Sequence, residues 1–356
     1  MILALFIFIT IYWYAIRKNK NKIVIYTKTT AFLFFLLAGL RNEAFYSDTY
    51  YYIQNFYNIG DMSVQDIIWN WPKDSFFYIF THYLHPIILH NYTLWLLLIS
   101  ALYIYPIYWL IKRYSPNPMI SWWCFALVGL MMFMMQGLRQ TMAMGIVLCG
   151  FIFLLKGKNK YFFLSIALAY LFHATSLIFA LVYPLTKLKF KFNKATILFY
   201  ISVFLIVILK GETMLKNATD FLSQSDARFI GYGEELHGST WTYTLQQAVL
   251  IVPILYFLRD RFKDATVAIL SHISLLAFIL VSLSPVIAEM YRLSMYFSWA
   301  EILLFPIALD EAKKYGNKSL EVLFVAFAMF YLLYIHALQI DYMFFFQDAS
   351  SVIRTF

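Results

Sequence analysis

Charged residues are scarce in this chain, and their scarcity excludes an ordinary soluble protein. Only 13% of the 356 residues are Asp, Glu, Lys or Arg, whereas 62% are hydrophobic and 21% are aromatic. A soluble chain carries roughly 25% charged and 45–50% apolar residues. We therefore predict a polytopic membrane protein of the all-α fold class.

Cysteine is almost absent as well. Cys124 and Cys149 each lie inside an apolar run without metal-ligand spacing, which argues against a disulfide framework and a zinc site. His82, His85 and His90 are irregularly spaced and have no carboxylate companions at ligand distance, so we expect no metal site there. The net charge of +9 comes from short basic clusters between apolar runs, which indicates membrane topology and not nucleic-acid binding.

Apolar runs long enough to cross a bilayer recur along the whole chain. They predict about ten full transmembrane helices, at 1–16, 24–40, 91–111, 119–136, 138–155, 195–209, 242–258, 265–283, 291–309 and 319–340. The run 1–16 lacks the basic region and cleavage site of a signal peptide, so we interpret it as a retained span. Residues 161–185 predict a re-entrant segment turning near FHATS or a pair of short helices. Residues 75–89 predict a half-inserted helix, for a total of 10–12.

Six basic clusters set the predicted orientation, because short loops rich in Lys and Arg stay cytoplasmic. The clusters occupy 17–22, 111–114, 156–160, 187–194, 259–263 and 313–314. If all six lie inside, both termini lie outside, together with the two substantial loops at 41–75 and 210–241. We predict a single transmembrane domain, 1–356, that works at its outer face.

Three arginines at predicted outer helix ends are the main functional signal. Arg139 is the only charge between residues 119 and 155, and a charge at membrane depth costs roughly 2.5–3.5 kcal/mol on insertion scales. Its partner comes from another helix, as in a purely structural ion pair, from a backbone cluster or from an anionic ligand. Arg41 either reaches the headgroups or binds a ligand, and Arg292 either pairs with Glu289 or lines a cavity. Since guanidinium forks suit phosphate oxygens, we expect all three arginines to converge on an anionic group.

The order of these residues resembles the EpsG-like polysaccharide polymerases, relatives of the Wzy-type O-antigen polymerases. The first block matches at Arg41, Asp48 and Tyr51, although Tyr46 and Ser47 replace the usual Gly and Thr. The second block matches at Arg139, Gln140, Ala143, Phe172, His173 and Ser176. The third block matches at Arg292 and Tyr296.

This resemblance implies a metal-independent glycosyltransferase without a cofactor, GT-C-like in architecture, in the bacterial cytoplasmic (inner) membrane. It would join undecaprenyl-pyrophosphate-linked repeat units into O-antigen or exopolysaccharide on the outer face. A flippase and a chain-length regulator of the same pathway are candidate partners. Two other readings stay open, an O-antigen ligase and a polysaccharide or lipid transporter, although the inverted repeats of a transporter are not evident.

The implied reaction assigns a role to each matched residue. The arginines, Arg139 and Arg292 above all, would stabilise the departing pyrophosphate, and no DxD-like motif is present to hold a metal for that purpose. Asp48, His173 or Glu289 would be the general base for the acceptor hydroxyl, although a histidine among apolar residues is more often a hydrogen-bonded core residue. The substrate-binding residues would be Arg41, Tyr51, Gln140 and Tyr296.

Overall fold

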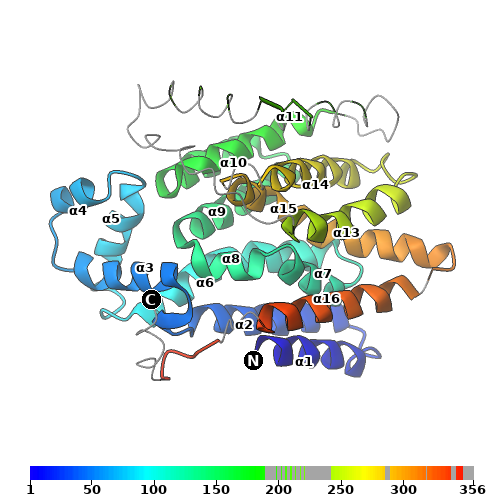
Figure 1. The fold of residues 1–356 in the computed structure, drawn as a ribbon, viewed down its shortest axis with the longest axis horizontal. Helices are drawn as coiled ribbons and strands as arrows, with labels where there is room; N and C mark the ends of the chain where they lie inside the picture. The colour runs from blue at the N-terminus through cyan, green and yellow to red at the C-terminus, as the bar shows by residue number, and fades with distance from the viewer. Residues whose placement is uncertain are drawn as a thin grey trace. The chain divides into compact units, whose positions relative to one another are not determined.

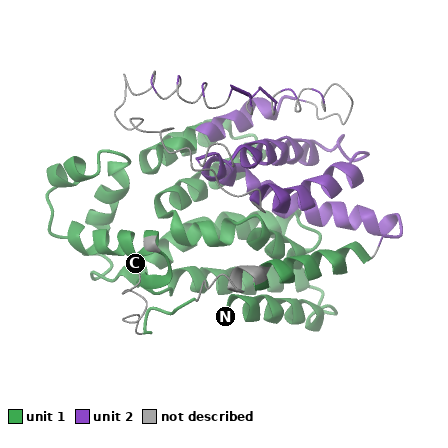
Figure 2. Ribbon diagram, viewed as in Figure 1, with its two compact units in different colours: residues 1–177, 318–356 green, residues 178–317 purple. Residues whose placement is uncertain are grey.

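The structure is a computed structural model, and it describes residues 1–188, 242–284, 289–317, 319–337 and 342–347, with a few single positions between 198 and 220. Within these ranges the secondary structure is helical, without a β-strand. The helices form two compact units, residues 1–177 with 318–356 (unit 1) and residues 178–317 (unit 2), which Figure 2 shows in separate colours. The all-α fold class is confirmed, and the single transmembrane domain stays a prediction.

Unit 1 is built around three helices that are long and apolar enough to span a membrane. These are α2 (Lys22–Gly39), α6 (Tyr92–Tyr114) and α9 (Leu138–Leu155). α6 packs against both others, and two glycines allow the close approach. A Cβ on Gly39 would lie 2.4 Å from the Leu97 side chain, and one on Gly145 would lie 2.5 Å from the Leu102 carbonyl oxygen. Small residues permit such backbone approach in membrane bundles.

The segment 119–136 differs from the single helix predicted for it. It forms α7 (Pro118–Leu127) and α8 (Leu130–Gln136), which meet at an angle of 56°. Gly129 lies at the break with φ of +81°, a backbone conformation that glycine adopts without steric cost. The prediction is corrected because continuous hydropathy does not reveal a break made by one glycine.

Short helices gather at one end of the unit 1 helices, at the left of Figure 1. They are η1 (Glu43–Phe45), α3 (Ser47–Ile59), α4 (Val64–Asn70) and α5 (Ser75–Leu84). α5 occupies the segment predicted as half-inserted. α10 (Asn159–Phe172) packs along α9 and against α5, and the chain changes to the 3-10 helix η2 (Ala174–Leu181) at the predicted FHATS turn.

Shorter apolar helices complete both units. In unit 1, α1 (Ile2–Ala15) contacts α16 (Ser319–Ala337). In unit 2, α14 (Ala265–Leu283) and α15 (Glu289–Lys314) form the main pair, accompanied by α11 (Val182–Leu185) and α13 (Thr242–Phe257).

The structure supports a multi-pass membrane protein but not yet the full helix count. Among the described residues, five helices are long and apolar enough to cross a membrane, or six with the bent α7–α8 pair. The predicted span 195–209 and the loop 210–241 lie mostly outside the described residues. The count of about ten spans and the GT-C-like architecture therefore stay predictions.

Candidate active site

Arg139 lies at the centre of an ionic cluster in unit 1. Its Nη1 is 3.4 Å from Oδ2 of Asp74, and Nδ1 of His173 is 2.7 Å from the same oxygen. The other oxygen of Asp74 accepts a hydrogen bond of 3.1 Å from the backbone N–H of Ala174. One carboxylate therefore joins the start of α9, the end of α10 and the loop before α5. Asp74 is therefore a partner of Arg139 from another part of the chain.

Asp74 is held in place by the backbone of its own loop. It is the residue before α5 and has a left-handed conformation, with φ of 56°, which Asp tolerates better than most residues. The side chain is only 8% exposed. Burial by itself raises the pKa of Asp74, but the bond to His173 and the charges of His173 and Arg139 outweigh it, so the pKa is below its ordinary value. Asp74 is an anion at neutral pH.

Aromatic side chains enclose the guanidinium of Arg139. Its Nε donates a hydrogen bond of 3.1 Å to the hydroxyl of Tyr52 in α3. The rings of Tyr52 and Tyr78 lie 5.9 Å and 5.7 Å from the guanidinium carbon, within range of a cation–π contact. Trp71 stacks on Tyr78, with 4.7 Å between ring centroids. The Arg139 side chain is 27% exposed, so a solute can reach a cation that the protein has already oriented.

Arg41 occupies a different environment in the same unit. It is fully buried, with Nη1 donating to the Ala38 carbonyl and Nε to the Thr49 hydroxyl at 3.5 Å. Its backbone forms an isolated antiparallel β-bridge with the backbone of Phe344, in the C-terminal segment 342–347. Among the described residues, its Nη2 has no hydrogen-bond acceptor. Burial lowers the pKa of Arg41 to about 9, which leaves it charged at neutral pH.

The other predicted site residues of unit 1 lie around α3 and α9. Asp48 is exposed in the first turn of α3, and it is not part of the Arg139 cluster. Tyr51 is 53% exposed and accepts a hydrogen bond from Trp71 at 3.3 Å. Gln140 is buried next to Arg139 in α9. The roles assigned to these residues and to Arg41 stay predictions.

The predicted site residues of the third block all belong to α15 in unit 2. Glu289 is half-buried and Arg292 is exposed in its first turn, whereas Tyr296 is buried. Arg139 and Arg41 belong to unit 1, so the convergence of the three arginines stays a prediction.

Sequence reasoning missed Asp74, Tyr52 and Tyr78. The residue types before α5, WPKDS, hold a detectable signal, because an Asp at the end of a loop and before an apolar run is typical of a helix start. Nothing in the sequence indicates that Asp74 contacts His173, which is 99 residues away.

The histidines 82, 85 and 90 form a second polar group at the same end of unit 1. Nδ1 of His85 lies 2.6 Å from Nδ1 of His90, and Nδ1 of His82 lies 3.0 Å from the Ile59 carbonyl oxygen. Among the described residues, no three His, Cys, Asp or Glu side chains are placed to hold a metal ion. The structure thus offers the Arg139 cluster, and not these histidines, as the candidate site.

The described part of the chain is helical and apolar, with several helices long enough to cross a bilayer, and this is the architecture of a multi-pass membrane protein. The chain belongs to the EpsG family, which matches residues 24–350, nearly the whole length. Membership of this family indicates a membrane polysaccharide polymerase with glycosyltransferase-like activity. Comparisons with characterised proteins and with solved structures gave no match.

Proposed function

We propose that this protein polymerises oligosaccharide repeat units carried on undecaprenyl pyrophosphate, at the outer face of the bacterial cytoplasmic membrane. The observation that carries the proposal is the cluster in which Arg139 and His173 share Oδ2 of Asp74. One member is a partly exposed cation and the other is a histidine oriented by a carboxylate. A base for the hydroxyl and a cation for the departing pyrophosphate both accelerate a glycosyl transfer of this kind.

Arg139 is suited to hold the pyrophosphate because its position favours an added anion. It lies in the first turn of α9, where the N-cap Gly137 has no side chain to cap the backbone N–H groups. A helix N-terminus carries a partial positive charge, so a cation there is destabilised until an anion arrives. Asp74 shares its Oδ2 between Arg139 and His173, so this carboxylate does not occupy the whole guanidinium fork. A pyrophosphate would bring further oxygen acceptors, which suit the planar guanidinium fork.

His173 is suited to act as the general base. Its Nδ1 is engaged by Asp74 at 2.7 Å, so the tautomer with the proton on Nδ1 leaves the lone pair on Nε2. In the proposed step, Nε2 takes the proton of the acceptor hydroxyl while the oxygen attacks the first sugar of the donor chain. The bond from that sugar to pyrophosphate breaks, and Arg139 stabilises the released anion. Asp74 stabilises the imidazolium that forms.

Accumulated lipid-linked intermediates in a deletion strain test the proposal against its alternatives. A polymerase defect leaves single repeat units on the lipid carrier at the outer leaflet, with short or no surface glycan. A ligase defect would instead leave full-length polymer on the carrier, and a transporter defect would leave single units at the inner leaflet. The measurement is mass spectrometry of extracted carrier lipids, combined with leaflet-specific accessibility to an added glycosidase. Either of the last two patterns would contradict the polymerase assignment.

The predicted orientation can be checked on the same strain background. Trp69 in α4 is 86% exposed, close in the chain to the cluster, whereas Lys158 lies in a basic loop predicted to be inside. An impermeant thiol reagent should label Trp69→Cys and not Lys158→Cys in intact spheroplasts. The reverse pattern would place the cluster on the cytoplasmic face and contradict the proposed location of the reaction.

A further inference from the structure

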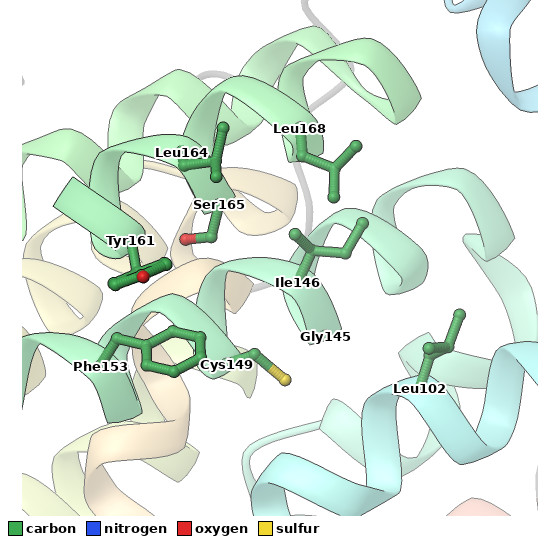
Figure 3. Close-up of a pocket in the computed structure, with 9 residues that line it drawn as sticks. All are labelled: Leu102, Gly145, Ile146, Cys149, Phe153, Tyr161, Leu164, Ser165 and Leu168. Carbon is green, nitrogen blue, oxygen red and sulfur yellow. The ribbon is translucent and has the colours of Figure 1, made fainter. Parts of the chain in front are cut away.

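An apolar groove runs along three helices of unit 1, next to the candidate site. It has a volume of about 290 Å³ and is lined by side chains of α6, α9 and α10, which Figure 3 shows converging on it. Its walls include Leu102, Ile146, Phe153 and Leu164. Leu164 is 64% exposed and Leu102 is 37% exposed, so the groove opens at the surface of the unit. The volume is near the lower end for ligand sites.

The groove and the ionic cluster share one stripe of α9. Arg139, Ile146 and Phe153 are seven residues apart, which is about two helical turns, so their side chains lie within about 40° of one another. The rise of 1.5 Å per residue places Ile146 roughly 10 Å from Arg139 along the axis. The groove therefore lies on the same face of α9 as the cation and begins about 10 Å along the helix from it.

α10, which packs along α9, also lines the groove. Tyr161, Leu164, Ser165 and Leu168 line it at the spacing of one helical face. Tyr161 packs near Phe153, with 5.4 Å between ring centroids, which marks the end remote from the cluster. Leu168 is five residues before His173, or about 7.5 Å along the axis. Both helices thus bring the opposite end of the groove towards the Arg139–Asp74–His173 cluster.

The floor of the groove includes a glycine and a serine whose hydroxyl is hydrogen-bonded within its own helix. Gly145 brings α9 against the backbone of α6, because a Cβ there would lie 2.5 Å from the Leu102 carbonyl oxygen. The hydroxyl of Ser165 donates to the Phe162 carbonyl at 2.7 Å, so it has no need of a polar partner in the groove. The lining is therefore apolar throughout its length, with a cation beyond one end.

We propose that this groove binds the first isoprene units of the polyprenyl chain whose pyrophosphate is held by Arg139. The inference rests on the proposed function and names the part of unit 1 that holds the lipid. An amphiphile with an anionic head and an apolar chain matches a cation followed by an apolar groove on one helix face. The pyrophosphate head favours a polyprenyl carrier over a phospholipid, because its larger negative charge better complements a guanidinium in the first turn of a helix.

Photo-crosslinking of the full chain in membranes tests this directly. The probe is a polyprenyl pyrophosphate with a diazirine in its first isoprene units, and mass spectrometry maps the labelled peptides. We expect labels within residues 145–153 and 161–168, competed by unlabelled undecaprenyl pyrophosphate and not by phosphatidylglycerol. Labelling spread evenly over lipid-facing helices, or equal competition by phosphatidylglycerol, would overturn the groove assignment.

A matched pair of variants separates the groove from general lipid contact. Leu164 and Leu323 are similarly exposed leucines, at 64% and 61%, but only Leu164 lines the groove. Leu164→Trp should reduce labelling of α9 and α10 about tenfold, or about 1.4 kcal/mol, because the larger ring occupies part of the groove. Leu323→Trp in α16 should leave labelling unchanged. Equal labelling of the wild type and Leu164→Trp, at equal protein abundance, would overturn the proposal.

The experiment also distinguishes failure of the groove from failure of the proposed function. If labels avoid the groove while the deletion strain accumulates single lipid-linked units, the groove assignment is wrong and the polymerase assignment holds. If labels lie in the groove while that strain makes normal long chains, the groove binds the carrier and the polymerase assignment is wrong.

Discussion

Arg139 and Arg41 are both arginines near helix ends of unit 1, yet the fold treats them in opposite ways. Arg41 is 0% exposed and bonds to a backbone carbonyl and a hydroxyl beneath the C-terminal segment. Arg139 is 27% exposed, pairs with a carboxylate and faces aromatic rings. An enclosed cation supports the structure around it, whereas a partly exposed and oriented cation can bind a solute.

α3 connects the two environments and explains how one helix serves both. Thr49 contacts Arg41 and also donates to the Met135 carbonyl at 2.7 Å, whereas Tyr52 contacts Arg139. The two residues are three apart and share one face of α3. The comparison teaches that the buried arginine helps to fix the helix that positions the exposed one. Thr49 thus supports the helix, and Tyr52, one turn further along it, orients Arg139.

Conservative lysine variants of the two arginines should give the largest contrast. Arg139→Lys keeps a charge but loses the guanidinium fork, so we expect polymerisation to fall about 10²–10³-fold with the protein retained in the membrane. Arg41→Lys should chiefly lower the amount of folded protein, because a lysine cannot reproduce both buried hydrogen bonds. The assay is surface-glycan chain length together with protein level.

Each outcome of that assay decides one side of the comparison. Normal long chains from Arg139→Lys would argue against phosphate binding and favour a structural ion pair. A loss of polymer per molecule from Arg41→Lys, at normal protein level, would return Arg41 to the substrate site that the sequence assigned to it.

Two Asp→Asn variants compare the carboxylate found in the structure with the one chosen from the sequence. Asp74→Asn can hydrogen-bond to His173 but favours the wrong tautomer and carries no charge for the imidazolium, so we expect a loss of about 10²-fold or more in polymerisation. Asp48→Asn should be close to wild type, because Asp48 is exposed and outside the cluster. The measurement is the rate of chain growth on purified lipid-linked units. A larger loss from Asp48→Asn than from Asp74→Asn would favour the sequence-based choice.

His85, at the same end of unit 1 as the Arg139 cluster, should have a smaller effect, limited to the response of stability to pH. Burial, and then the nearby His90, lower the pKa of His85. Between the lowered pKa and the ordinary value of about 6.5, the unfolded chain binds more protons than the folded one, so stability decreases as pH falls. We expect the thermal midpoint in detergent to fall by a few degrees at most from pH 7.5 to 5.5.

Removal of the titrating group is the control for this effect. His85→Gln should lose less stability over the same pH interval than the wild type. An equal loss in both proteins would show that the acid sensitivity does not arise at His85.

The predicted helix boundaries agree closely with the structure for several of the apolar runs that it describes. The run 138–155 became α9, and 265–283 became α14. Hydropathy succeeds there because lipid demands an unbroken apolar helix. It failed at 119–136, where Gly129 bends the segment, since a run of apolar residues looks the same whether or not its backbone turns.

The sequence by itself determined that this is a membrane protein and that Arg139 needs a partner, because composition and an isolated charge are local properties. It also marked His173 as a candidate base. Only the tertiary structure decided that Asp74 joins these two residues, that Asp48 does not, and that Arg41 is enclosed. These outcomes depend on contacts between segments far apart in the chain, and such contacts are fixed by packing, which no local pattern of residues records.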